Sequence, residues 1–224
     1  MSEHSLMVET IETKPTLRRR IIEAADTLIR EHGLTGATTR EIAKAAGCAE
    51  GSIYVHFEDK IDLVIAVMVE REPYFAELLE LPNRAGEGTV EDNLVPWVEE
   101  LIKLVHDNQP IFYALMGDRS VFMRFKERLR ERETGPVAIF RTAATYIGAE
   151  QELGRLDERA HPDVVASILI GACRDQVLTH ALAGGKAPVD PAVFARELVH
   201  TIVFGLAPAG ARGHSLPNSK EEPS

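Results

Sequence analysis

Between residues 38 and 57, apolar residues recur at the spacing of two short helices joined by a tight turn. Each helix has apolar residues at i, i+1 and i+4: Ile42, Ala43 and Ala46, then Ile53, Tyr54 and Phe57. Thr38 and Glu41 have the spacing of a capping box, which gives the first helix a defined start. Gly47 is expected to end that helix, because the residue after a helix often has positive φ, which glycine adopts without strain. The pattern therefore predicts a helix-turn-helix unit.

A further helix is predicted immediately before this unit, from Pro15-Thr16 to Gly33. Its apolar residues follow a helical period: Leu17, Ile21, Ala24, Ala25, Leu28 and Ile29. Arg18, Arg19 and Arg20 lie in its first turn, where the helix dipole favours anions rather than cations. Two interpretations stay open for these arginines, a solvated basic face or contact with DNA phosphate. A helix-turn-helix of this size is typical of DNA-binding proteins, in which the second helix enters the major groove.

The rest of the chain has helical rather than alternating periodicity, so we predict an all-α protein. Prolines and glycines divide it into helices at 60–81 with a kink or a restart at Pro73, 89–108 with a bend at Pro96, 110–116 starting at Pro110, 118–133, 136–153, 161–184 and 190–205. Residues 83–89 are predicted to be a turn-rich connection. Residues 1–14 lack periodicity, and residues 208–224 are rich in Pro, Gly, Ser and charge, so we expect both segments to be disordered.

Charge is distributed unevenly along the chain. The net charge is −10, yet residues 14–62 contain eight basic and eight acidic side chains. The remainder therefore carries the whole excess of acid. A basic surface for nucleic acid must come from the placement of cations on one face of the amino-terminal part. The candidates are Arg18, Arg19, Arg20, Arg40, Lys44 and Lys60.

The expected location is the cytoplasm. Cys48 and Cys173 lie far apart in sequence and are interpreted as thiols in a reducing compartment rather than a disulfide. The longest uncharged apolar run, residues 164–173, is ten residues long, about half of what a membrane span needs. No basic, apolar leader opens the sequence.

In its helix-turn-helix, the chain resembles the TetR family of transcriptional regulators. The resemblance covers roughly the first quarter of the chain and rests on Thr39, Ile42-Ala43, Ala46-Gly47, Ser52-Ile53-Tyr54, His56-Phe57, Lys60 and Leu63. Ala49 stands where the family often has Ser, so the second helix should lack a side-chain N-cap worth about 1 kcal/mol. Val55 stands where an aromatic or polar residue is common. The resemblance implies a helix-turn-helix DNA-binding domain at 15–62 and a helical ligand-binding and dimerisation domain at 63–207.

The resemblance also implies that both helices of the unit bind double-stranded operator DNA. Phosphate contacts are expected from Thr39, Arg40, Tyr54, His56 and Lys60. Glu50, Gly51 and Ser52 should face base edges from the first turn of the second helix, and Val55 completes the predicted DNA-binding set. Glu50 has an equal alternative, in which its charge stabilises the helix N-terminus and stays away from DNA.

Large adaptable side chains are concentrated between residues 89 and 153. Most of them are expected in the core, but together they allow an apolar cavity between helices with a few polar groups. We therefore predict a pocket for a mainly apolar small-molecule effector. Its predicted lining is drawn from Trp97, Phe112, Tyr113, Met116, Met123, Tyr146 and Arg174.

The last two helices carry apolar faces that suit either a monomer core or a partner. Phe194, Leu198 and Ile202 follow one another at i+4 spacing. The small residues Ser167 and Gly171, also four apart, permit close approach of another helix. The resemblance implies that these two helices pair with their symmetry mates in a four-helix homodimer interface, as a palindromic operator requires.

Motifs for catalysis or cofactor binding are missing from the sequence, which has no nucleophile elbow, HExxH, phosphate-binding glycine loop or CxxC. His56 has no carboxylate or histidine at a helical spacing that would suit a metal. We therefore expect no enzymatic activity, no cofactor and no metal. The leading hypothesis is a dimeric repressor released from DNA by its ligand. The rivals are a ligand-carrying helical protein or enzyme, and a helix-turn-helix used for protein partners.

Overall fold

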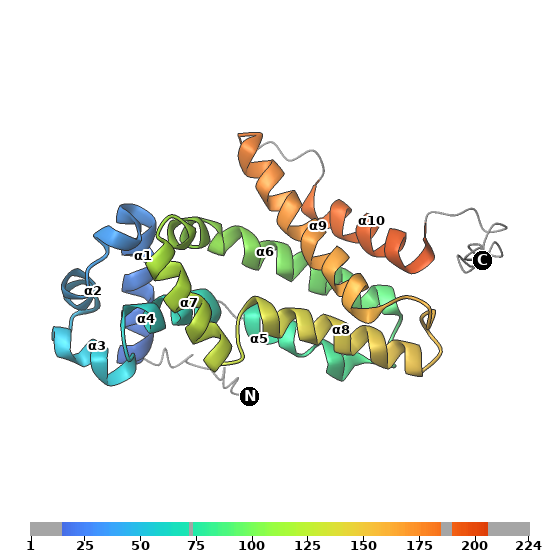
Figure 1. The fold of residues 1–224 in the computed structure, drawn as a ribbon, viewed down its shortest axis with the longest axis horizontal. Helices are drawn as coiled ribbons and strands as arrows, with labels where there is room; N and C mark the ends of the chain where they lie inside the picture. The colour runs from blue at the N-terminus through green and yellow to red at the C-terminus, as the bar shows by residue number, and fades with distance from the viewer. Residues whose placement is uncertain (1–14, 72–73, 185–189, 206–224) are drawn as a thin grey trace, which may run out of the picture. The chain divides into compact units, whose positions relative to one another are not determined.

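The computed structural model describes residues 15–71, 74–184 and 190–205 (Figure 1). Within these ranges the chain is helical and contains no strand, which confirms the all-α prediction. None of the described helices is long and apolar enough to cross a lipid bilayer. In chain order the elements are α1 Leu17–Gly36, α2 Thr39–Ala46, α3 Glu50–His56, α4 Lys60–Glu70, α5 Tyr74–Leu79, the 3-10 helix Leu81–Arg84, α6 Val90–Met116, α7 Arg119–Glu131, α8 Pro136–Glu152, α9 Pro162–Leu182 and α10 Pro191–Phe204.

The helix-turn-helix forms as the capping signals predict. The Thr38 hydroxyl accepts the Glu41 backbone N–H at 3.2 Å, and the Glu41 carboxylate accepts the Thr38 N–H at 3.1 Å. Gly47 ends α2 in the left-handed region with φ 67°. Ala49 precedes α3 and supplies no side-chain hydrogen bond to it, as expected. The predicted end of the first helix is also present, since Gly33 has φ 72° and interrupts the helical geometry of α1.

Prolines begin α8, α9 and α10 at Pro136, Pro162 and Pro191 as predicted, but Pro110 does not begin a helix. Pro73 lies outside the described residues, and the helix predicted over 60–81 is divided into α4 and α5. Pro110 does not start a new helix, which corrects the sequence interpretation, because α6 is continuous from Val90 to Met116. A proline removes only one helical hydrogen bond. The residues after it, Ile111 and Leu115, are fully buried, so packing keeps the helix unbroken.

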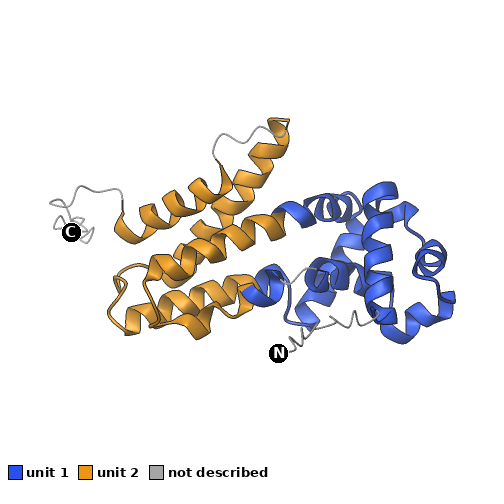
Figure 2. Ribbon diagram, turned by 180° about the vertical axis from the view of Figure 1, so that it is seen from behind, with its two compact units in different colours: residues 1–77, 106–138 blue, residues 78–105, 139–224 orange. Residues whose placement is uncertain are grey.

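The chain divides into two compact units (Figure 2). Unit 1 takes its residues from 1–77 and 106–138, so it joins the helix-turn-helix to α4, the end of α6 and α7. Its core combines apolar residues of α1 to α4 with Ile111, Leu115 and Phe125. All seven residues from Ile61 to Val67 are buried, as expected for a helix covered on every side. The boundary predicted between Asp62 and Leu63 therefore falls inside α4, within unit 1.

Unit 2 takes its residues from 78–105 and 139–224. A buried polar network holds its first connection against α8. Asn93 donates to the Tyr146 hydroxyl at 3.2 Å and to the carbonyl of Glu87 at 2.8 Å. Glu150 is fully buried and accepts the Gly86 N–H at 3.2 Å, while Arg155 pairs with it at 2.9 Å. Because each buried polar group needs a partner, this network fixes the connection before α6.

We expect Gly47→Ala to lower the free energy of unfolding by about 1–2 kcal/mol, because a β-carbon is strained at φ 67°. Gly148→Ala is the matched control. It lies inside α8 with no atom within 4 Å of the added carbon, so alanine should raise stability by about 0.5–1 kcal/mol. Urea titration of both variants checks this, and equal stabilities would contradict the assigned role of Gly47.

Candidate nucleic-acid interface

Helices α2 and α3 present most of the predicted DNA-binding side chains to solvent. Tyr54 and Val55 are 55% and 80% exposed, which is unusual for large apolar side chains next to the buried Ile53. Ser52 and Thr39 are half-buried, and four further members of the predicted set are exposed: Arg40, Glu50, Gly51 and His56. The exposed Lys44 of α2 adds a cation. The two helices thus place hydrogen-bonding, cationic and apolar groups on exposed positions.

A hydrogen bond joins the first residues of α2 and α3. The Thr39 hydroxyl donates to the Glu50 carboxylate at 2.6 Å. Glu50 therefore has a second function that neither interpretation from sequence included, because it fixes one helix of the pair to the other. The Thr39 hydroxyl has a single proton, so it cannot donate to a phosphate while this bond is made.

Lys60 has its ammonium directed into unit 1. Its Nζ donates to the carbonyl of Leu34, just after the break in α1. Burial lowers the pKa of Lys60, and the nearby Glu41 carboxylate opposes this shift. An ammonium group has three protons, so Lys60 can contact a phosphate either in place of the Leu34 carbonyl or together with it.

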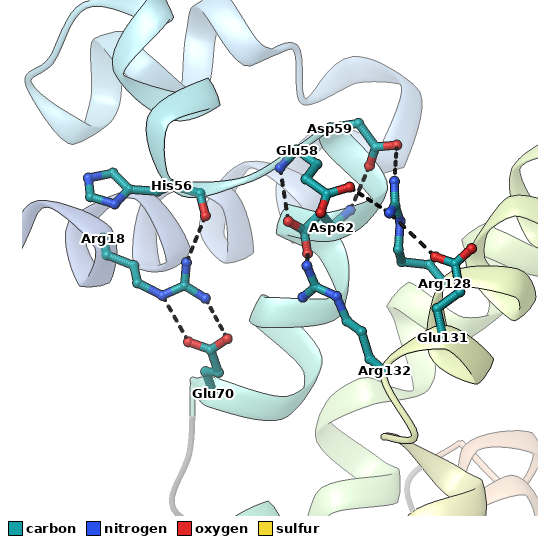
Figure 3. Close-up of polar contacts among 9 residues, drawn as sticks. All are labelled: Arg18, His56, Glu58, Asp59, Asp62, Glu70, Arg128, Glu131 and Arg132. Carbon is teal, nitrogen blue, oxygen red and sulfur yellow. Dashed lines mark hydrogen bonds and ion pairs between the residues drawn. The ribbon is translucent and has the colours of Figure 1, made fainter.

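Arg18 is held inside unit 1 by groups from α3 and α4 (Figure 3). Its guanidinium donates to both carboxylate oxygens of Glu70, at 3.1 and 2.6 Å, and to the His56 carbonyl at 3.0 Å. It also lies 4.5 Å from the centre of the Phe57 ring. Neither interpretation from sequence, a solvated face or a phosphate contact, describes these bonds. Of the other two arginines in that turn, Arg19 is exposed and pairs with Glu23 at 2.8 Å.

The connection between α3 and α4 is fixed by two carboxylates, Asp59, which caps α4, and Asp62, which reaches back from the first turn of α4. Asp59 accepts the Asp62 N–H at 2.8 Å, and Asp62 accepts the Glu58 N–H at 2.9 Å. Burial alone would raise the pKa of Asp59, but the Asp62 N–H and the arginines of α7 outweigh it and lower the pKa.

Three arginines spaced four residues apart contact this connection or the start of α4; we call them the arginine face: Arg124 and Arg128 of α7, and Arg132 directly after its end. Arg124 and Arg128 reach Asp59 at 2.9 and 3.4 Å. Arg128 also reaches Glu58 at 2.6 Å, and Arg132 reaches Asp62 at 2.5 Å (Figure 3). Sequence analysis missed this set, although the spacing of four was a visible signal for one helical face.

The residues predicted to line an effector pocket lie in both units. Trp97 and Tyr146 are buried in unit 2, where the Trp97 indole donates to the Leu78 carbonyl at 3.0 Å. Burial raises the pKa of the Tyr146 hydroxyl. Arg174 is exposed on α9. The remaining four belong to unit 1, with Phe112 half-buried and three side chains about half exposed: Tyr113, Met116 and Met123.

Helices α9 and α10 pack against each other and also leave apolar side chains exposed. On α9, Leu169, Cys173 and Val177 are buried, so one face belongs to the interior of unit 2. The opposite face has exposed apolar side chains at helical spacing, Val164, Ile168, Leu178 and Leu182, with the exposed Gly171 and Asp175 between them. Of the predicted dimer residues, Ser167 and Gly171 are exposed, and three on α10 are half-buried: Phe194, Leu198 and Ile202.

Known proteins with similar sequences are transcriptional regulators. A family model described as bacterial regulatory proteins, tetR family, matches residues 21–67, which span α1 to α4. The uncharacterized HTH-type transcriptional regulator YdgC of Bacillus subtilis is 24% identical over 86% of this chain and 94% of its own. The HTH-type transcriptional repressor AcnR of Corynebacterium glutamicum is 40% identical over 67 residues, which are 30% of this chain and 36% of AcnR.

Solved structures share the whole fold at low identity. A protein from Mesorhizobium loti assigned to the TetR family of transcriptional regulators aligns with a TM-score of 0.65, 20% identity, and coverage of 83% of this chain and 93% of its own. The transcriptional regulator FadR of Bacillus subtilis, solved in complex with stearoyl-CoA, aligns with a TM-score of 0.62 and 18% identity, covering 84% and 98% of the two chains.

The described residues combine an amino-terminal helix-turn-helix that has an exposed second helix with further helices, an arrangement typical of DNA-binding transcriptional regulators. The relatives and solved structures named above are transcriptional regulators. Residues 21–67 of this chain match the TetR family of such regulators.

Lys60 and Lys44 differ in a way that binding measurements can resolve. We expect Lys44→Ala to flatten the plot of log K against log salt by about one and to leave stability unchanged, because its ammonium is exposed. Lys60→Ala should flatten the plot equally and also lower the free energy of unfolding by about 1 kcal/mol through the lost Leu34 contact. An unchanged salt slope for Lys60→Ala would show that Lys60 contacts the Leu34 carbonyl but no DNA phosphate.

Proposed function

We propose that this protein is a homodimeric repressor that binds a palindromic operator and is released from it by a mainly apolar small molecule. The observation that carries the proposal is the exposed face of α3 beside α2, within a unit that matches the TetR-family model. The repressor AcnR, 40% identical over the matched residues, supports repression as the direction of control. Such a protein acts where the DNA is, in the cytoplasm.

At the operator, α3 enters the major groove and α2 crosses the backbone. Ser52 reads a base edge by donating or accepting a hydrogen bond, and the exposed Val55 suits the methyl group of thymine. Arg40, Lys44, Tyr54 and His56 contact phosphate, so they position the protein without selecting sequence. Glu50 supports this surface through Thr39 and adds a negative charge that weakens binding to any duplex.

Dimerisation places two copies of α3 at successive turns of the duplex. The exposed apolar residues of α9, Val164, Ile168, Leu178 and Leu182, support a helical interface, because four large apolar side chains exposed on one helix face favour burial against a partner. Ser167 and Gly171 beside it are exposed and small, so a partner helix can approach closely. The half-buried Phe194, Leu198 and Ile202 extend the interface along α10.

The effector is proposed to be a compound with a long apolar part. The structure of FadR with stearoyl-CoA supports this class, because that protein shares the fold over 84% of this chain. Trp97, Tyr146 and Arg174 are the proposed contacts within unit 2. Release requires the effector to bind the DNA-free conformation more tightly than the DNA-bound one.

Selection of bound duplexes from a random pool tests the function directly. We expect the purified protein to enrich a palindrome whose half-sites lie about one helical turn apart. Stearoyl-CoA added to the enriched operator should raise its Kd, and the operator should weaken stearoyl-CoA binding by the same factor. A pool without enrichment would contradict sequence-specific binding. An enriched operator that stearoyl-CoA leaves unaffected would contradict only this class of effector.

Ile168→Glu tests the dimer interface without disturbing the core. Ile168 is 49% exposed, so a charge there should leave the monomer folded while it opposes burial against a partner. We expect sedimentation to give a monomer and operator affinity to fall. Val137→Glu makes the same kind of change at a 56% exposed residue of α8 and should leave a dimer. A dimeric Ile168→Glu protein would place the interface elsewhere.

A further inference from the structure

The residues between the recognition helix and α4 have few contacts of their own to keep them in place. Only Phe57, Glu58 and Asp59 separate the end of α3 from the start of α4, and of these Phe57 alone has a buried apolar side chain. Helix α3 is seven residues long and has no side-chain N-cap, so it depends on its surroundings for its position. What holds this connection therefore sets where α3 lies.

The carboxylates of Asp59 and Asp62 each divide their two oxygens between a backbone N–H and the arginine face. Asp59 uses Oδ1 for the Asp62 N–H and Oδ2 for Arg124 and Arg128. Asp62 uses Oδ2 for the Glu58 N–H and Oδ1 for Arg132. Loss of the guanidinium groups would leave one oxygen of each carboxylate without its charged partner. At Asp62, which is 2% exposed, water cannot fully replace that partner.

Helix α7 is itself anchored in unit 1 by its other side. Phe125 is 3% exposed in the core formed with α1 to α4, and Leu129 packs against the same core. The arginine face can therefore act as a fixed support. Exposed ion pairs alone would contribute little. The contact between Arg132 and Asp62 is different, because its carboxylate is buried.

We infer that the arginine face positions the recognition helix for operator binding, as a support outside the helix-turn-helix itself. Arg124, Arg128 and Arg132 contact no DNA in this proposal and act through Glu58, Asp59 and Asp62. The inference rests on the proposed function and adds residues to it. Its consequence is selective: specific binding needs both recognition helices at a set separation, whereas non-specific binding depends mainly on charge.

The test compares two double variants, each of which loses two positive charges in or directly after α7. Arg128→Gln/Arg132→Gln removes two members of the arginine face. Lys126→Gln/Arg130→Gln removes two exposed cations of α7 that take no part in the ion pairs described above. For each protein, Kd is measured at one salt concentration for the selected operator and for a scrambled duplex of equal length. The readout is the ratio of the two values.

We expect the preference for the operator, which is the Kd for the scrambled duplex divided by the Kd for the operator, to fall about two- to thirtyfold in the arginine-face variant. This is the range found for residues that couple to a site without touching its ligand. The control variant should bind both duplexes less tightly and keep the wild-type ratio. A smaller folded fraction would weaken both complexes equally, so destabilisation alone leaves the ratio unchanged. An arginine-face variant with the wild-type ratio would overturn the inference.

A double-mutant cycle tests whether Arg132 acts through Asp62. Arg132→Gln and Asp62→Asn should each reduce the ratio, and the double variant should lose no more than the larger single effect. Additive losses would show that Arg132 acts elsewhere.

Wild-type protein that selects no duplex would instead refute the proposed function. In that case hydrogen exchange at the Glu58 and Asp62 amides still tests whether the arginine face holds the connection. Faster exchange in the arginine-face variant than in the control would support this role, and equal rates would refute it.

Discussion

Burial of α4 is the constraint on which unit 1 depends. No face of this helix from Ile61 to Val67 reaches water, so α1, α7 and the end of α6 must all cover it. A helix enclosed in this way fixes its neighbours relative to one another. Helix α3 is joined to α4 by three residues only, and the helix-turn-helix also packs on α1, so its position follows from the core that α1 to α4 share and from how α4 is capped.

Local signals in the sequence predicted the helix-turn-helix in detail. Thr38 with Glu41 and the glycines at 33 and 47 act within one turn of the backbone, so their effect is visible without knowledge of the fold. Pro110 gave a wrong boundary for a complementary reason. The burial of Ile111 and Leu115 by residues distant in sequence decides the course of α6, and no local pattern reports that burial.

The candidate site divides in the same way between local and distant causes. Val55 and Arg40 were expected on the DNA-binding surface from the family resemblance, and both are exposed. The partners of Arg18 and Lys60 could not be predicted, because Glu70 and the Leu34 carbonyl lie 52 and 26 residues away. Some of the cations that the sequence suggested for DNA binding, such as Arg18 and Lys60, thus make contacts within the protein. Charge counts cannot separate these two uses.

The discontinuity of unit 1 has a consequence for how such a regulator can be divided or recombined. Its amino-terminal 77 residues share one core with residues 106–138. A gene fusion that transplanted the first segment alone would expose the apolar face that Phe125 and Leu115 cover, and leave Asp62 without its guanidinium. New specificity is therefore more readily acquired by exchange of individual residues on α3 than by exchange of an amino-terminal module.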